Sequence, residues 1–244
     1  MKKLMLVTLI LFTVSCKQNP KKKTVAEAKP VEKEWVDIFD GVSFAGWHQF
    51  NSSEISDAWT VEDGAMVFNP ALKEKGTSND IITDSEYTNF ELSLEWNIGE
   101  VGNSGIFWGV KEGVGFNKPY QTGPEIQVLD NERHPDSFQN PNFHKAGALF
   151  DLVQPTTDVC KPAGEWNHVL LSIDYNANKG SVKLNNVEIV TFPLSGPEWN
   201  ALVSNSKFRN DKRFIDFGKY KTGKIGLQDH GDKVSYRNIK IRKL

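Results

Sequence analysis

Short runs of alternating apolar and polar residues recur along most of this chain, with turn-forming residues between them. In the clearest run, Phe90, Leu92, Leu94 and Trp96 occupy every second position. Successive side chains of a strand point to opposite faces of a sheet, so this period of two predicts strands with one buried face. The sequence contains no sustained helical period and no glycine-rich phosphate loop. The pattern therefore favours an all-β fold.

Turn residues divide several of these runs into hairpins. Asp63-Gly64 lies in the middle of segment 59–68, and Asn185-Asn186 lies in the middle of segment 181–190. Both pairs tolerate the positive φ angles that tight hairpin turns require. Segment 224–241 has a similar outline, so we predict a last hairpin there.

The length and composition fit one sizeable folded core. The chain has 244 residues, of which 39% are hydrophobic and 11% aromatic, and all-β sandwiches of this size are commonly single domains. We predict one domain over residues 35–244, either a sandwich or a jelly roll, with little helix. The one short helix that we expect lies around Trp199 to Arg209.

Residues 1–16 have the features of an export signal. Two lysines precede an apolar run from Leu4 to Val14, which is too short to span a bilayer. The run ends in Thr13-Val14-Ser15-Cys16, which resembles the lipobox of bacterial lipoproteins. We predict an exported bacterial protein, periplasmic or anchored to the outer membrane by a lipid on Cys16; a plain cleaved signal is the alternative. Residues 17–34 are mostly Lys, Pro, Ala and Glu, which is typical of a flexible tether.

Charge and cysteine content exclude other classes of protein. The formal net charge of −2 gives no electrostatic reason to bind nucleic acid. No His or Asp pattern surrounds Cys160, so we expect a lone thiol rather than a nucleophile, a disulfide or a zinc ligand. Trp108 and Phe116 lie on or after a glycine-rich turn and could stack on a sugar ring. Four other tryptophans are expected in the core: Trp47, Trp59, Trp96 and Trp166.

Two of the alternating segments each carry a pair of polar side chains. Glu125 and Gln127 alternate with apolar residues, and near the C-terminus Gln228 and His230 do the same. Each pair therefore shares one face of a strand. A solvated outer sheet face would explain either pair alone, whereas two such strands side by side could form one site.

Eight short motifs occur in the order found in one known family. They are Phe39-Asp40-Gly41 with Gly46-Trp47, Trp59-Thr60-Val61-Glu62-Asp63-Gly64, Asn103-Ser104-Gly105-Ile106, Glu125-Ile126-Gln127-Val128-Leu129-Asp130, Gly147-Ala148-Leu149-Phe150, Gly164-Glu165-Trp166-Asn167, Gly226-Leu227-Gln228-Asp229-His230-Gly231 and Tyr236-Arg237-Asn238-Ile239-Lys240-Ile241. The sequence over residues 35–244 thus resembles the 3-keto-disaccharide hydrolase family, also described as 3-keto-glucoside 1,2-lyase and 3-keto-2-hydroxy-glucal hydratase. The resemblance implies a concanavalin-like jelly roll. Phe150 stands where many members have Tyr, so a hydroxyl role there does not carry over.

The implied activity needs a base, a group that stabilises an enolate, and an acid. A ketone at C3 of a sugar acidifies the C2 hydrogen, so the C1 substituent can leave by β-elimination and water can add to the resulting glucal. Either Glu125 or His230 could be the base, and Lys145 could stabilise the enolate. An oxidoreductase that oxidises the sugar at C3 is the implied functional partner. Five residues are expected to hold the substrate: Asn103, Gln127, Gln228, Trp108 and Asp130.

A divalent metal ion could also stabilise the enolate. His134, His144 and Asp229 lie in or beside the two polar motifs, and imidazole and carboxylate groups are ordinary ligands of such ions. These residues lack a local spacing of the His-x-x-x-His kind, so the sequence leaves the metal an open alternative to Lys145.

Two other functions remain open at this point. A non-catalytic carbohydrate-binding jelly roll is one, because a fold does not fix a function. The other is a conventional glycoside hydrolase, which requires two carboxylates across the scissile bond. Glu125 with Glu95 or Asp130 could supply that pair.

Overall fold

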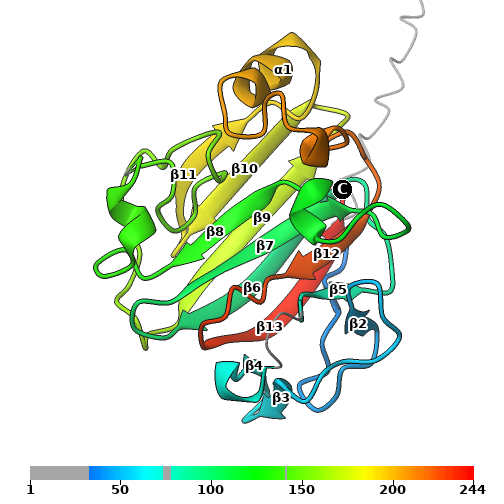
Figure 1. Cartoon of the computed structure of the whole chain (residues 1–244), viewed down its shortest axis with the longest axis vertical. Helices are drawn as coiled ribbons and strands as arrows, with labels where there is room; N and C mark the ends of the chain where they lie inside the picture. Colours follow the sequence, from blue (N-terminus) through cyan, green and yellow to red (C-terminus); the bar gives the residue numbers. More distant parts are fainter. Residues whose placement is uncertain (1–32, 74–77, 141) are drawn as a thin grey trace, which may run out of the picture. The chain divides into compact units, whose positions relative to one another are not determined.

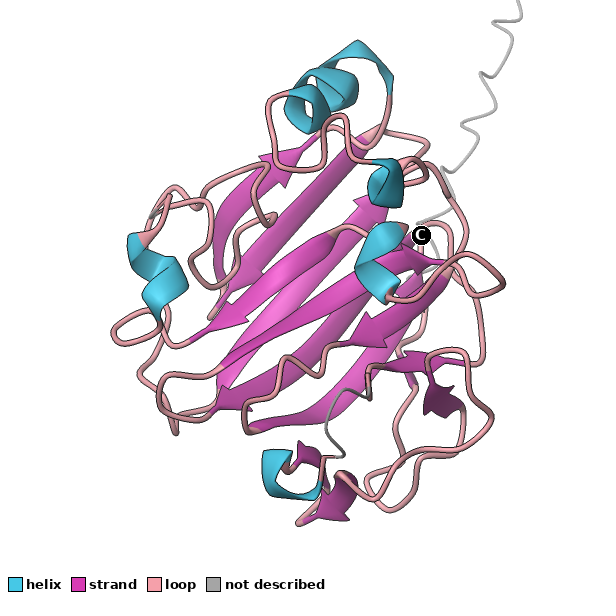
Figure 2. Ribbon diagram, viewed as in Figure 1, coloured by secondary structure: helices cyan, strands magenta, loops and turns pink. Residues whose placement is uncertain are grey.

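The computed structural model describes residues 33–73, 78–140 and 142–244, and within them two antiparallel sheets pack face to face (Figures 1 and 2). This confirms the predicted jelly-roll sandwich. The predicted signal peptide, the lipobox and nearly all of the predicted tether lie outside the described residues. No helix among the described residues is long and apolar enough to cross a membrane.

The two sheets differ in size. The larger sheet contains β1 (Val36–Asp37), β3 (Trp59–Glu62), β4 (Ala65–Phe68), β6 (Phe90–Ile98), β9 (Asn167–Asp174), β10 (Lys179–Leu184), β11 (Val187–Phe192) and β13 (Val234–Lys243). The smaller sheet contains β2 (Trp47–Gln49), β5 (Ile81–Thr83), β7 (Asn103–Val110), β8 (Glu125–Leu129) and β12 (Lys224–Leu227). The strand order is β11-β10-β9-β6-β13-β4-β3 in the first, with β1 beside β13, and β2-β5-β12-β7-β8 in the second.

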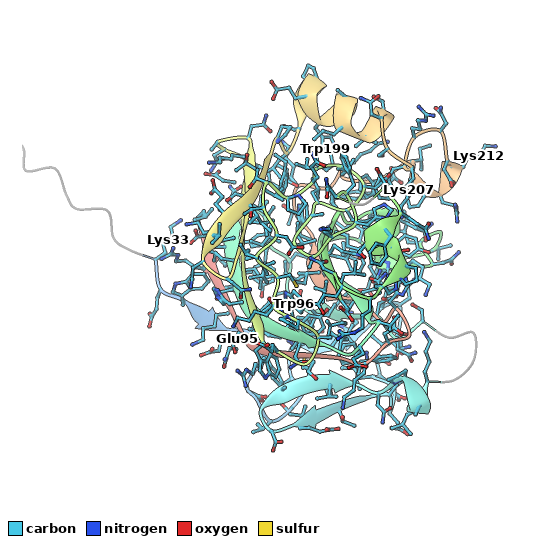
Figure 3. All side chains as sticks on the ribbon, turned by 90° about the vertical axis from the view of Figure 1, so that its left-hand side faces the viewer. Lys33, Glu95, Trp96, Trp199, Lys207 and Lys212 are labelled. Carbon is cyan, nitrogen blue, oxygen red and sulfur yellow. The ribbon has the colours of Figure 1, made fainter. Side chains whose placement is uncertain are left out.

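The core lies between the two layers. Strand β6 alternates fully buried and half-buried residues along its length, as its sequence predicts, so Trp96 points inward and Glu95 outward (Figure 3). From the smaller sheet, Trp108 packs against Phe192 with ring centroids 5.7 Å apart. Trp108 is therefore a core residue, and the predicted sugar contact is wrong. Trp166, by contrast, is only half-buried and lies under the guanidinium of Arg237.

The first two of the three predicted hairpins form as predicted. Asp63 and Gly64 have φ angles of 50° and 76° between β3 and β4, and Asn185 and Asn186 have φ angles of 50° and 70° between β10 and β11. These are the positive angles that such residues adopt at little cost.

The last predicted hairpin does not form. Strand β12 belongs to the smaller sheet and β13 to the larger one, so the chain crosses between the layers in the loop that contains His230. Ile225 of β12 and Tyr236 of β13 both point into the same core, each from its own sheet. Alternation indicates a buried face but cannot indicate which sheet supplies it.

The helices are short and lie in connections. They are α1 (Gly196–Ser204), η1 (Pro70–Leu72), η2 (Pro119–Gln121), η3 (Pro135–Phe138) and η4 (Lys212–Phe214). Helix α1 begins and ends earlier than predicted. It begins earlier because Pro197 is tolerated in the first turn, where a missing N–H costs nothing. The segment after it, around Lys207, is therefore a loop.

Candidate functional site

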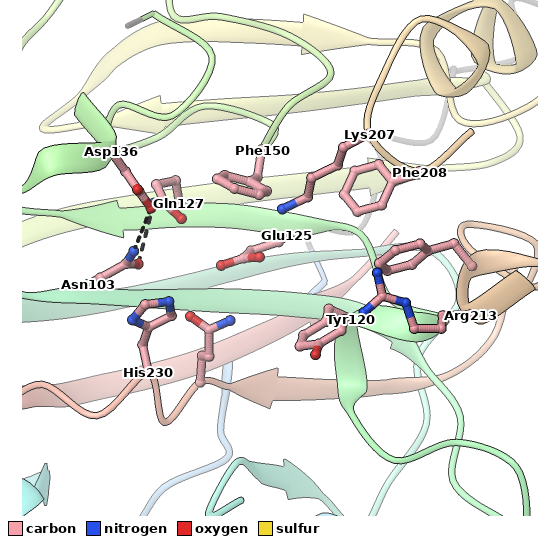
Figure 4. A pocket seen from close by; sticks show the side chains of 12 residues that line it. Asn103, Tyr120, Glu125, Gln127, Asp136, Phe150, Lys207, Phe208, Arg213 and His230 are labelled. Carbon is pink, nitrogen blue, oxygen red and sulfur yellow. Dashed lines mark hydrogen bonds between the residues drawn. The ribbon is translucent and has the colours of Figure 1, made fainter. Parts of the chain in front are cut away.

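A cavity of about 350 Å³ lies on the outer face of the smaller sheet (Figure 4). Its size falls within the range of ligand sites, roughly 300–1,000 Å³. It is lined by Asn103, Tyr120, Glu125, Gln127, Asp136, Phe150, Lys207, Phe208, Arg213, Phe214, Gln228 and His230. The two polar pairs predicted from the sequence, Glu125 with Gln127 and Gln228 with His230, thus face a single cavity.

The strand order explains why these pairs meet. Strand β7 lies between β8 and β12, and Gly105 of β7 is paired with Gln127. The backbone N–H of Gln228 donates to the carbonyl oxygen of Gly105 at 2.9 Å. Below them, the Ser104 hydroxyl donates to the carbonyl oxygen of Gln228 at 2.7 Å and lies 2.7 Å from the Tyr236 hydroxyl of the larger sheet. The floor of the cavity is therefore held by both layers.

Gly105 leaves the space that the Glu125 carboxylate occupies. A Cβ atom at position 105 would lie 2.1 Å from Glu125 Oε1. We expect Gly105→Ala to displace the Glu125 side chain, because the added atom would also lie 2.7 Å from its Cδ and 2.8 Å from its Cγ. If Glu125 reacts with the substrate, a displacement of this size should lower kcat by about a hundredfold.

Steady-state kinetics and thermal unfolding together check this prediction. Because Gly105→Ala would act through the Glu125 carboxylate, adding it to Glu125→Gln should lower kcat little further. Additive losses, or normal kcat in the single variant, would contradict this role of Gly105.

One half of the cavity is a network of amides and carboxylates. Gln127 Nε2 donates to Asn103 Oδ1 at 3.4 Å, and Asn103 Nδ2 donates to Asp136 Oδ2 at 3.2 Å (Figure 4). The amide oxygens of Gln127 and Gln228 are buried and accept no hydrogen bond within the described part of the protein. A buried acceptor without a donor is costly, so both oxygens are suited to hydroxyl groups of a ligand.

Glu125 stands between this polar half and the rest of the cavity (Figure 4). Burial raises the pKa of its carboxyl to about 8, against the opposing effect of the positive charges of Lys207 and His230; the negative charges of Asp80 and Asp136 raise it further. A carboxyl that titrates near neutral pH is suited to take up and release protons in that range.

Two cationic groups flank Glu125. Lys207 Nζ lies over the Phe150 ring, 3.9 Å from its centroid. Burial lowers the pKa of Lys207 from its usual range. On the other side, the carboxylate of Asp232 raises the pKa of His230, whose side chain is 46% exposed. His230 therefore carries positive charge over a wider pH range than an isolated histidine.

Two further predicted site residues lie outside the cavity. Lys145 Nζ pairs with Asp158 at 3.3 Å in a different surface hollow. Asp130 is buried at the end of β8 and accepts a hydrogen bond from the Val101 N–H at 2.9 Å. Both predictions require correction: Lys207 is the lysine at the cavity, and Asp130 fixes the loop before β7.

The predicted metal ligands do not converge. His134 Nδ1 accepts a hydrogen bond from the Asp136 N–H at 3.1 Å, and His144 Nε2 lies 3.1 Å from Asp151 Oδ1 behind the Phe150 ring. Asp229 Oδ2 pairs with Lys73 at 2.7 Å. Among the residues described by the structure, no group of three His, Cys, Asp or Glu side chains is placed to hold a metal ion. The donor set here does not fit a metal site.

The sequence did not point to half of the cavity lining. Asp136, Lys207 and Arg213 come from loops and short helices whose path alternation cannot predict. The one available signal was the length of the loop after β8, because long irregular loops often carry function.

The fold is that of a jelly-roll protein with a polar and aromatic cavity on the outer face of its smaller sheet. Residues 34–242 match the family described as the 3-keto-alpha-glucoside-1,2-lyase-like domain. The chain belongs to this family.

Similar proteins occur in Bacteroides and Parabacteroides species. A "3-keto-disaccharide hydrolase" of Bacteroides thetaiotaomicron is 34% identical over 237 residues, which cover 88% of this chain and 80% of that protein. A crystal structure from Parabacteroides distasonis, provisionally described as a glycosyl hydrolase, is 32% identical with a TM-score of 0.77, covering 86% of this chain and 94% of that one. A second structure from that organism, with the same provisional description, is 23% identical with a TM-score of 0.63 over 86% of this chain and 100% of that one, and supports the fold alone.

Proposed function

We propose that this protein is a carbohydrate-cleaving enzyme that cuts 3-keto-glycosides by β-elimination and then hydrates the resulting 3-keto-2-hydroxy-glucal. Family membership supports action on oxidised sugars. The observation that carries the proposal is a buried carboxyl of raised pKa, Glu125, between the Lys207 and His230 cations in a cavity with unpaired amide acceptors.

Each group has a proposed role in the reaction. Glu125 removes the C2 proton, and the positively charged His230 donates a hydrogen bond to the ketone oxygen as negative charge develops there. The enolate then re-forms the C3 carbonyl, C1=C2 forms, and the C1–O bond breaks. The departing oxygen takes a proton from Lys207. In the second half, neutral Lys207 takes a proton from water as the water oxygen adds to C1, and Glu125 returns its proton to C2; both groups recover their starting protonation states, which completes net hydrolysis.

The test compares a glucoside with its 3-keto derivative. We expect release of the aglycone from the oxidised sugar alone, with a transient enone absorbance and uptake of solvent deuterium at C2. Cleavage of the unmodified glucoside would indicate a conventional hydrolase, and binding without cleavage of either would indicate a carbohydrate-binding module. The substrate also requires an oxidoreductase that introduces the ketone at C3.

The conventional hydrolase has weaker support. Glu95 lies on the larger sheet, where it accepts a hydrogen bond from Arg237 Nε at 2.6 Å, and Asp130 is buried away from the cavity. Neither of the expected second carboxylates faces Glu125, so these residues do not form the carboxylate pair required for that mechanism. Asp136 also lines the cavity, where it accepts a hydrogen bond from Asn103 at 3.2 Å.

A further inference from the structure

The catalytic cavity has two chemically different halves. Asn103, Gln127, Asp136 and His230 lie on one side of Glu125, and Lys207, Phe208, Tyr120 and Arg213 lie on the other (Figure 4). The first half offers amide, carboxylate and imidazole groups. We call the second the aromatic half and define it by the rings of Tyr120, Phe150, Phe208 and Phe214.

The rings of the aromatic half pack against one another. Phe208 stacks on Phe217 with centroids 3.9 Å apart and meets the Phe214 ring edge-on at 5.0 Å. The ring centroids of Tyr120 and Phe214 lie 6.1 Å apart. Because these rings support one another, their faces need little rearrangement when a ligand arrives.

This half has fewer groups that can bond to hydroxyls than the other half. Three of its four rings are phenylalanines, the Arg213 guanidinium is paired with Asp211 at 2.6 Å, and the Tyr120 hydroxyl and the Lys207 ammonium are its other polar groups. A second pyranose here would find fewer hydrogen-bond partners than among the amides, and a hydroxyl without a partner is costly in a partly closed site. A flat apolar ring would instead contact the aromatic faces and lose no hydrogen bonds.

We propose that the aromatic half is the subsite for the leaving group and that it selects a flat aromatic aglycone over a second sugar. This inference rests on the proposed cleavage of oxidised glycosides, because that reaction places the sugar ring among the amides and the C1 substituent beyond Glu125. Lys207, over the Phe150 ring, then stands at the junction of the two halves, beside the bond that breaks.

Binding of unoxidised ligands tests the subsite without any reaction. The dissociation constants of methyl glucoside, benzyl glucoside and a glucosyl-glucose disaccharide, all of one anomeric form, would be measured by calorimetry. We expect the benzyl compound to bind at least about tenfold more tightly than the other two. Equal affinities would overturn the proposal, and so would tighter binding of the disaccharide. Cleavage of methyl 3-keto-glucoside is measured separately. If that cleavage is not found, the order of the three affinities still tests the proposed subsite.

Substitutions at Phe208 test whether its ring produces the preference for an aromatic aglycone. In Phe208→Ala and Phe208→Leu the ratio of benzyl to methyl affinity should fall towards one, since both remove the flat ring. Phe208→Leu keeps most of the bulk packed on Phe217, and thermal unfolding verifies that each variant is folded. Phe138→Ala is the matched control, because Phe138 is 67% exposed and lies outside the cavity. A preference that persists in a folded Phe208 variant would overturn the assignment.

Discussion

In Glu125→Gln we expect kcat for a 3-keto-glucoside to fall by at least about a hundredfold, with a much smaller change in KM. The amide keeps the shape and burial of the carboxyl but cannot accept the C2 proton. Rapid mixing with methyl 3-keto-glucoside and detection of the enone would measure the loss. Glu95→Gln is the matched control, since that carboxylate lies on the other sheet. A normal rate in Glu125→Gln would remove Glu125 from the mechanism.

The pH dependence of the wild-type enzyme tests the same role. A base works in its ionised form, and burial raises the pKa of Glu125 to about 8. We therefore expect kcat/KM to rise with pH towards about 8 as Glu125 ionises, and to fall at higher pH as Lys207 and His230 lose the protons that the mechanism uses; the rise should be absent in Glu125→Gln. A wild-type profile without the rising limb would contradict the role of Glu125 as the base.

The sequence predicted the sheet faces well because alternation reports burial directly. Glu125, Gln127 and Gln228 are placed by their own strands, so the period of two was enough to select them. The two pairs share one cavity because β7 lies between β8 and β12. This strand order joins segments that are far apart in the sequence. Only the ordered motifs of a known family could indicate it.

The remaining predictions failed where position depends on loops or on the opposite layer. Trp108 belongs to a strand whose side chains are buried on both faces. Its position next to a glycine-rich turn therefore wrongly suggested an exposed side chain. Lys145 and Lys207 both lie in loops, and only the folded loops decide which of them reaches Glu125. Composition alone gave no reason to choose between these lysines.

Lys207→Met should lower kcat by about a hundredfold to a thousandfold, and more for a methyl than for a 4-nitrophenyl leaving group. Methionine has a similar unbranched apolar chain but carries no charge and no proton. A nitrophenolate leaves without protonation, so it depends less on an acid. Loss of the positive charge should also raise the pKa of Glu125 further, because Lys207 lowers it in the wild type. The rising limb of kcat/KM would then move to higher pH.

Lys145→Met is the matched control for this substitution, because its ammonium pairs with Asp158 outside the cavity. It should change neither the rate nor the pH profile. A merely structural role of Lys207 would lower the activity of all substrates equally and leave the rising limb in place. Equal losses for methyl and nitrophenyl compounds would argue against Lys207 as the proton donor, and an unmoved limb would argue against its charge acting on Glu125. The two measurements thus separate proton donation by Lys207 from its electrostatic effect on the base.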